Sequence, residues 1–141
     1  MGPGTVSAVT LLLLGLFTVS ASAACRVSGL WETKKNSNEG TKITIRLKDD
    51  GLFSGTYREE GSSTLSNLTG YQQDGDQPTF SFAVKSKTSA STIAHIGCCY
   101  LPPNGEDILI TTRIVKKSST HPSDCLKITT TQVNFTRIFV S

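Results

Sequence analysis

The sequence predicts an all-β fold, an eight-stranded antiparallel up-and-down β-barrel. After residue 24 the chain shows little helical periodicity and breaks into short runs of alternating apolar and polar residues. This period of two is typical of half-buried strands. Gly, Asn, Asp, Ser and Pro separate the runs, as turn residues do in sandwiches and barrels. Closure into a barrel also removes the edge strands that an isolated sheet exposes.

Eight strands are expected in order along the chain. The dipeptides Asp50-Gly51 and Asn104-Gly105 predict tight hairpin turns, because Gly, Asn and Asp tolerate a positive φ. The length of the chain suggests one domain. The expected strands are residues 26–32, 42–48, 52–59, 65–72, 78–85, 91–100, 108–117 and 126–139.

The first 23 residues are expected to form a secretory signal peptide. Residues 9–19 are an apolar run, which is too short to span a bilayer because spanning needs roughly 20 residues. Ala21-Ser22-Ala23 follows with the small residues that a signal peptidase recognises. The sequence therefore predicts a secreted protein whose mature domain is residues 24–141, with no membrane segment of its own.

The composition argues against several classes of function. The formal net charge is only +3, from 14 Lys and Arg against 11 Asp and Glu, without a basic stripe, so no nucleic-acid partner is expected. His95 and His121 are far apart and lack a Ser or Cys nucleophile in a known motif. One histidine without neighbouring ligands does not make a zinc site. We therefore expect no enzyme, no metal and no cofactor.

Four cysteines and two glycosylation sequons fit an oxidising compartment. The cysteines are Cys25, Cys98, Cys99 and Cys125, and an even number allows three disulfide pairings. The sequons begin at Asn67 and Asn134 and are predicted glycosylation sites.

The strand from residue 108 to 115 has two apolar rows. Ile108, Ile110 and Ile114 lie on one face, and the row of Leu109 and Val115 lies on the other. One interpretation is that a second subunit covers the outer face. The other is that Ile and Thr are simply good strand formers.

Several segments resemble one known family in order and spacing. A Gly-x-Trp motif such as Gly29-Leu30-Trp31 occurs in both lipocalins and avidins. Residues 51–57 (GLFSGTY) resemble the avidin family's third strand, residues 77–84 its fifth, residues 97–105 its sixth strand and turn, and residues 135–137 the end of its eighth. The mature chain is therefore similar to the avidin family over nearly all of its length.

The resemblance implies a biotin-binding protein without catalysis, assembled as a homotetramer. Tyr57 matches the phenol that donates to the ureido oxygen of biotin, and Ser37 matches a serine donor to the same atom. Ser89 and Ser91 match the polar loop after the fifth strand. In the last strand, either Asn134 or Val133 matches a group that accepts a ureido N–H, because a slip of one residue changes the face.

The family's intrachain disulfide matches Cys25 and Cys99. Cys98 and Cys125 are then expected near opposite barrel ends, roughly 25 Å apart. A disulfide needs Cα atoms within about 7 Å, so we predict that these two cysteines do not pair within one subunit.

The departures from the family predict a weakened site. Trp31 is the only tryptophan of the chain, so the pocket indoles of the family are missing. The positions of these indoles are taken by Ser86, Arg113 and either Cys125 or Leu126. In the ureido cage, Thr33 replaces an asparagine. His95 replaces an apolar wall residue, and Glu59 replaces a small hydroxyl residue.

Three interpretations of the function follow from these departures. The first is biotin binding of reduced affinity, and the second is a structural or defence barrel that has lost the ligand. The third is a carrier of a different small anionic ligand, bound by Arg113. Against the third stands the possibility that Glu59 and Arg113 form an ion pair with each other.

Overall fold

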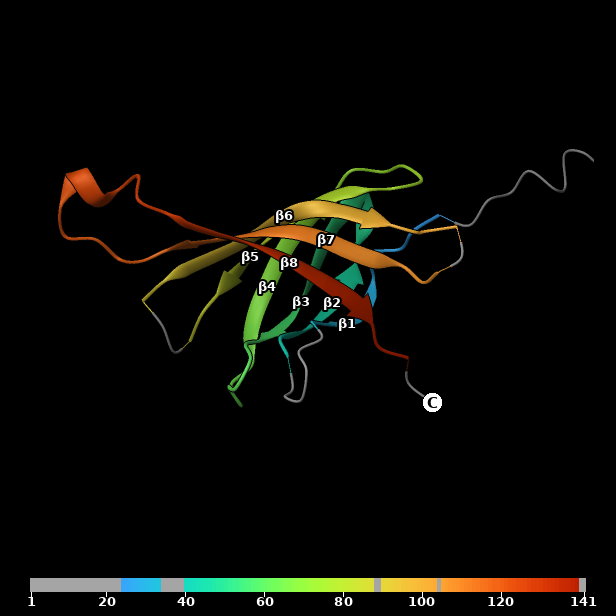
Figure 1. Ribbon diagram of the computed structural model, residues 1–141, viewed down its shortest axis with the longest axis horizontal. Helices are drawn as coiled ribbons and strands as arrows, with labels where there is room; N and C mark the ends of the chain where they lie inside the picture. The colour runs from blue at the N-terminus through green and yellow to red at the C-terminus, as the bar shows by residue number, and fades with distance from the viewer. Residues whose placement is uncertain (1–23, 34–39, 88–89, 104, 140–141) are drawn as a thin grey trace, which may run out of the picture.

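The computed structural model describes residues 24–33, 40–87, 90–103 and 105–139. They form a closed barrel of eight antiparallel strands in sequential order, which confirms the predicted fold (Figure 1). The strands are β1 Gly29–Glu32, β2 Lys42–Leu47, β3 Leu52–Arg58, β4 Ser66–Gln72, β5 Thr79–Lys85, β6 Thr92–Tyr100, β7 Ile108–Lys116 and β8 Thr129–Arg137. Two short 3₁₀ segments, η1 Asp49–Gly51 and η2 Pro122–Asp124, lie in the connections before β3 and β8.

Alternation along each strand places one row of side chains inside the barrel. In β5, Phe80, Phe82 and Val84 are buried and the residues between them are exposed. The same alternation holds in β7, where Leu109 and Thr111 are buried and Thr112 is exposed. The interior is therefore a packed core from one end to near the other. Its largest fully buried members are Trp31, Phe135, Ile43, Leu68, Leu109 and His95.

The predicted hairpin turn at Asp50-Gly51 is present. Asp50 has φ 63° and Gly51 has φ 76°, and two successive residues with positive φ are the geometry that such a turn requires. Lys48 donates its backbone N–H to the carbonyl of Leu52 at 2.7 Å across this turn. At the second predicted turn, Gly105 donates to the carbonyl of Pro102 at 3.3 Å, whereas Asn104 lies outside the described residues.

The barrel closes through β1 and β8, which share only two residue pairs, Trp31 with Arg137 and Glu32 with Thr136. A cluster at the base supports this short seam. The indole of Trp31 is completely buried and donates to the carbonyl of Val27 at 2.9 Å. The guanidinium of Arg137 lies 4.2 Å from the Trp31 ring centroid and pairs with Asp107 at 2.7 Å.

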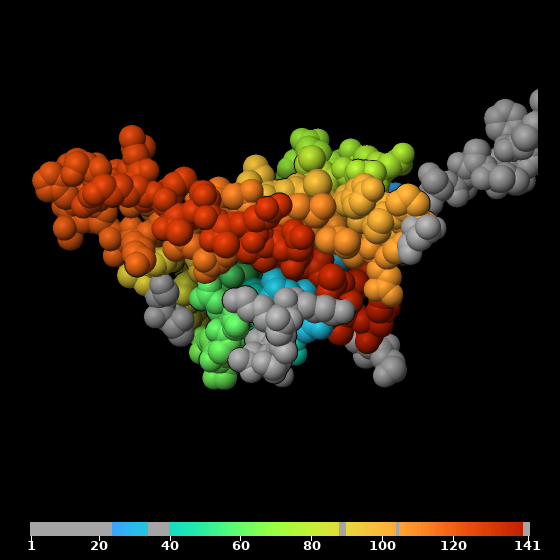
Figure 2. All heavy atoms as spheres, in the orientation of Figure 1, coloured from blue at the N-terminus to red at the C-terminus, as the bar shows by residue number. Residues whose placement is uncertain are grey.

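The last strand begins later than predicted. The sequence indicated a strand from residue 126, but β8 begins at Thr129 because Pro122–Asp124 forms η2 and the chain then turns. Leu126 is 91% exposed in this connection. The segment between β7 and β8 extends well away from the body of the barrel (Figures 1 and 2). The first strand is also shorter than predicted and begins at Gly29 rather than at Arg26.

One disulfide links Cys25 to Cys99, with Cα atoms 5.7 Å apart. It ties the segment before β1 to β6, in agreement with the family pairing. Cys98 and Cys125 are both free. The prediction that these two cysteines do not pair within one subunit is therefore confirmed.

Candidate functional site

The candidate site is the polar part of the interior, at the barrel end where β3 leads into β4 and β7 leads into β8. Tyr57 and Glu59 come from β3 and its end, His95 from β6, and Thr111 and Arg113 from β7. The strand register sets Phe82 opposite His95, and His95 opposite Arg113. Because side chains of one face recur at every second residue, this register brings the polar groups together inside an otherwise apolar barrel.

Tyr57 is 2% exposed, and its hydroxyl makes no hydrogen bond of normal geometry within the described part of the chain, although the Arg113 guanidinium and Thr41 lie close enough to interact with it. Burial raises the pKa of this phenol, and the neighbouring Arg113 guanidinium opposes that rise. The phenol therefore keeps its proton at neutral pH. Burying a hydroxyl without a partner is unfavourable by about 1–3 kcal/mol, so Tyr57 is a donor prepared for a partner inside the barrel.

Glu59 and Arg113 form an ion pair at the barrel end that holds the candidate site, with Arg113 Nη2 donating to Glu59 Oε1. The two side chains are 43% and 26% exposed, respectively. Pairs with this much exposure are worth little stability, about 0–1 kcal/mol. The sequence left two possibilities for Arg113, a bound anionic ligand or an ion pair with Glu59. The structure shows the ion pair.

His95 is 1% exposed and lies in an aromatic setting. Its ring stacks on Phe82 at a centroid distance of 4.7 Å and lies 5.5 Å from the Phe135 ring. Nδ1 is 3.0 Å from the hydroxyl of Thr111. Burial, helped by the nearby Arg113 charge, lowers the pKa of His95 to about 4, so the ring is neutral at physiological pH.

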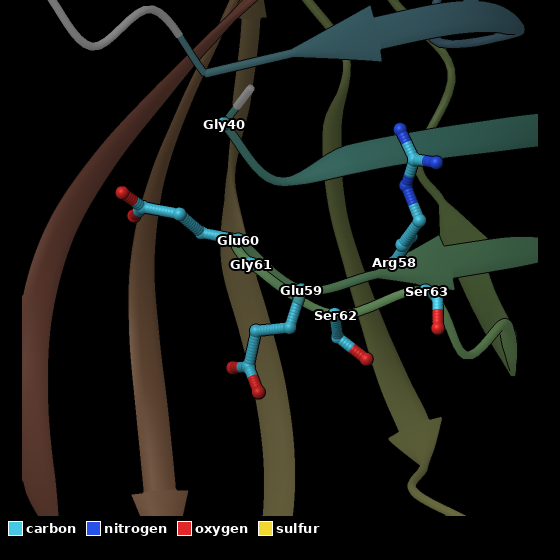
Figure 3. Close-up of a pocket in the computed structure, with 7 residues that line it drawn as sticks. All are labelled: Gly40, Arg58, Glu59, Glu60, Gly61, Ser62 and Ser63. Carbon is cyan, nitrogen blue, oxygen red and sulfur yellow. The ribbon is translucent and has the colours of Figure 1, made fainter. Parts of the chain in front are cut away.

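Little free space remains beside these groups. An interior cavity of about 10 Å³ is lined by Tyr57, Glu59, Val84 and Ile93, among others, and that is close to the room of a single water molecule. Outside it, an open depression of about 490 Å³ lies along the β3–β4 turn. Glu59 and Ser62 border both spaces, and they point to the same side of the turn, away from Arg58 (Figure 3). Glu59 and Ser62 therefore lie between the interior cavity and the outer depression.

The remaining predicted site residues are placed unequally. Thr33 uses its hydroxyl to accept the backbone N–H of Thr41 at 2.9 Å. Ser91 is half-buried just before β6. Ser37 and Ser89 lie outside the described residues.

The register of β8 decides between Val133 and Asn134. Val133 packs against the core, opposite Thr111, whereas Asn134 is exposed and lies opposite Ile110 on the outer face. Asn134 was a predicted ligand contact, but from this face it does not reach the interior. The other sequon residue, Asn67, is also exposed, on the outer face of β4.

Sequence reasoning did not single out Thr111, whose hydroxyl links His95 to the carbonyl of Val133 at 2.9 Å. A signal was available, because Thr111 stands two residues before Arg113 and so shares its face. Ser66, which borders the interior cavity, was missed for a different reason. It begins β4 directly after a polar turn and looks like part of that turn.

The described residues contain no group of three His, Cys, Asp or Glu side chains suited to a metal ion. Within those same ranges, none of the helical segments has the length and apolar character needed to cross a membrane.

The chain is similar in sequence to known proteins. Residues 21–138 match the avidin family. Avidin-related protein 4/5 of Gallus gallus is 36% identical over 139 residues, which cover 91% of this chain and 90% of the relative. Avidin of Gallus gallus is 31% identical over 141 residues, with the same coverage of both chains.

Solved structures give the same result. Xenavidin superimposes with a TM-score of 0.72 at 32% identity, covering 82% of this chain and 99% of Xenavidin. A biotin binding protein from chicken superimposes with a TM-score of 0.73 at 28% identity, covering 84% of this chain and 100% of that protein. The sequence match over residues 21–138, together with the shared barrel fold, shows that the chain belongs to the avidin family.

Proposed function

We propose that the protein binds biotin inside the open end of its barrel, with an affinity well below that of a site walled by tryptophans. The observation that carries this proposal is Tyr57, a buried phenol that makes no hydrogen bond of normal geometry within the described residues, at the position that matches the family's ureido donor. The similarity to a biotin binding protein from chicken supports the choice of ligand.

The weak affinity follows from the walls of the site. The chain's one tryptophan, Trp31, lies at the base of the barrel under Arg137 and not at the entrance. A buried aromatic wall removes about 150–250 Å² from water, and burial is worth about 25 cal/mol per Å². Losing even part of the contact with three such walls removes several kcal/mol of binding free energy. Each ~1.4 kcal/mol that is lost weakens the affinity tenfold.

A second candidate function is a structural or defence barrel that has lost its ligand. The cavity of about 10 Å³ favours it, because biotin needs far more room than a single water molecule. The third interpretation, an anionic ligand held by Arg113, has less support because Glu59 already satisfies that guanidinium.

Titration calorimetry with biotin separates these functions. We expect binding in the micromolar range for the wild-type protein, and at least tenfold weaker binding for Tyr57→Phe, because the ureido oxygen loses a buried donor. Tyr71→Phe is the matched control, since Tyr71 is exposed. The absence of any heat with the wild type would favour the second candidate, and equal affinities for wild type and Tyr57→Phe would contradict the first.

We also propose that the protein is secreted, glycosylated and oligomeric. The Cys25–Cys99 disulfide supports an oxidising compartment, and the exposure of Asn67 and Asn134 supports modification of both sequons. The apolar outer row of β7, together with Ile96, which is 56% exposed on β6, supports association with further copies of the chain as a homotetramer.

A further inference from the structure

The hydroxyl of Thr111 fixes the position of the proton on His95. A threonine hydroxyl has one proton, and that of Thr111 is donated to the carbonyl of Val133 at 2.9 Å. Toward His95, which is 3.0 Å away, the same oxygen can therefore only accept. Nδ1 of His95 must carry the proton, and in the neutral ring Nε2 is left with a lone pair that can accept a hydrogen bond.

This lone pair has no partner. Nε2 is buried, and no hydrogen-bond donor reaches it within residues 24–33, 40–87, 90–103 and 105–139. The ring cannot easily turn to find one, because Phe82 stacks on it at 4.7 Å and Thr111 holds Nδ1. Buried polar atoms in native proteins are nearly always paired, so a rigid unpaired acceptor points to a group supplied from outside the chain.

A donor without a partner lies in the same interior. The ring centroid of Tyr57 is 6.0 Å from that of His95, and the Tyr57 hydroxyl makes no hydrogen bond of normal geometry in the described residues, with the Arg113 guanidinium beside it. Together the two side chains offer one donor and one acceptor. The charges nearby are already compensated, because Arg113 is paired with Glu59.

We propose that Nε2 of His95 accepts a hydrogen bond from the ligand and selects neutral molecules that carry an N–H beside a carbonyl, as cyclic ureas and lactams do. Tyr57 donates to the carbonyl oxygen and His95 accepts from the adjacent N–H. An anionic group is disfavoured because it would face the lone pair of Nε2. This inference rests on the proposed function, since it assigns a specificity-determining residue to the same interior site.

The first test needs no ligand. Spectra of protein labelled with ¹⁵N-histidine show which ring nitrogen carries the proton, and a His121→Gln variant assigns the two histidines. We expect the Nδ1–H form for His95 at neutral pH. A proton on Nε2 would overturn the inference, because the ring would then have no acceptor to offer.

The second test compares ligands that differ only in the donor. 2-Imidazolidinone has two N–H groups, and 1,3-dimethyl-2-imidazolidinone has none. We expect 2-imidazolidinone at millimolar concentration to shift the Nε2 signal of His95, and the dimethyl compound to leave it unchanged. Equal effects of the two compounds, or no effect of either, would overturn the inference.

The third test uses biotin with variants that keep a folded barrel. His95→Phe retains a ring to stack on Phe82 but has no acceptor, whereas His95→Gln keeps an acceptor oxygen. We expect biotin to bind at least about tenfold more weakly to His95→Phe, with partial recovery in His95→Gln. If biotin binds wild type and His95→Phe equally, the inference fails and the proposed function stands. If biotin fails to bind while 2-imidazolidinone binds through His95, the choice of biotin fails and the inference stands.

Discussion

At the scale of single residues, His95 is the most consequential departure from the family. It introduces a titratable ring where the family has an apolar wall, between Phe82 of β5 and Arg113 of β7. In the described part of the chain, the ionisable groups beside it are Arg113 on β7, which pairs with Glu59, and Tyr57 on β3, while β5 and β8 contribute the aromatic residues Phe82 and Phe135. The result is a histidine that the barrel holds neutral.

This neutral state predicts a loss of stability in acid. The pKa of His95 is lowered from 6.5 to about 4 in the folded barrel, so below pH 6.5 the unfolded chain takes up a proton that the folded chain refuses. The contribution of His95 is intact above pH 6.5 and decreases as pH falls to about 4, by about 3 kcal/mol in all.

Chemical unfolding at pH 7 and at pH 4.5 measures this effect. Between pH 7 and pH 4.5, the free energy of unfolding of the wild type should fall by about 2–3 kcal/mol more than that of His95→Phe. The carboxylates that also titrate are common to both proteins, so their effect cancels in the comparison. Equal losses would mean that His95 is protonated in the folded state.

At the scale of elements, the seam between β1 and β8 is the weakest part of the barrel, because it has only two residue pairs. Arg137 reinforces it by donating to the carbonyls of Ser28 at 2.7 Å and Arg26 at 2.6 Å, and by pairing with Asp107. This one side chain joins β8, the segment before β1 and the connection before β7.

Replacement of Arg137 by alanine should therefore destabilise the protein by about 3 kcal/mol or more, since it leaves the Asp107 carboxylate unpaired and removes contact with Trp31. Arg137→Lys should cost less but still be measurable, because an ammonium lacks the planar fork of donors. Arg46→Ala, an exposed arginine on β2, is the control and should stay within about 0.5 kcal/mol of wild type. Thermal or urea unfolding of the wild type and the three variants measures these differences. An unchanged unfolding midpoint for Arg137→Ala would contradict the role of Arg137 in holding the seam.

The elements were largely predictable from the sequence, and the site only in part. Alternation and turn residues identified all eight strands, and Asp50-Gly51 identified a hairpin, because these signals are local. The start of β8 was not predictable, since the apolar residues Leu126 and Ile128 continue its pattern while both are exposed in the structure. Whether Arg113 pairs with Glu59 or binds a ligand depends on how the two side chains are oriented across strands. That orientation cannot be derived from a single sequence.

At the scale of the whole molecule, the outer face of β7 and β8 has two predicted uses that exclude each other. It carries the apolar row that supports subunit contact, and it also carries Asn134, which lies opposite Ile110. A glycan on Asn134 would project from the middle of that face and keep a second copy away.

Native mass spectrometry of the separated glycoforms tests this exclusion. Molecules with a glycan on Asn134 should be monomeric, and molecules without it, or an Asn134→Gln variant, should form larger assemblies. A glycan on Asn67 should not alter assembly through this face, because Asn67 lies on β4. Tetramers that carry a glycan on every Asn134 would show that subunits meet elsewhere.

The central claim is that this barrel keeps the family's polar donor but closes its site with the Glu59–Arg113 ion pair, in which Arg113 stands in place of an aromatic wall and Glu59 in place of a small hydroxyl residue. The most direct measurement is the biotin Kd of the wild type and of the double variant Glu59→Ser/Arg113→Trp by titration calorimetry. One restored indole wall should add about 2–3 kcal/mol even if the ligand covers only half of it, so we predict micromolar binding for the wild type and at least about 30-fold tighter binding for the variant. A picomolar Kd for the wild type, or no gain in the variant, would contradict the account.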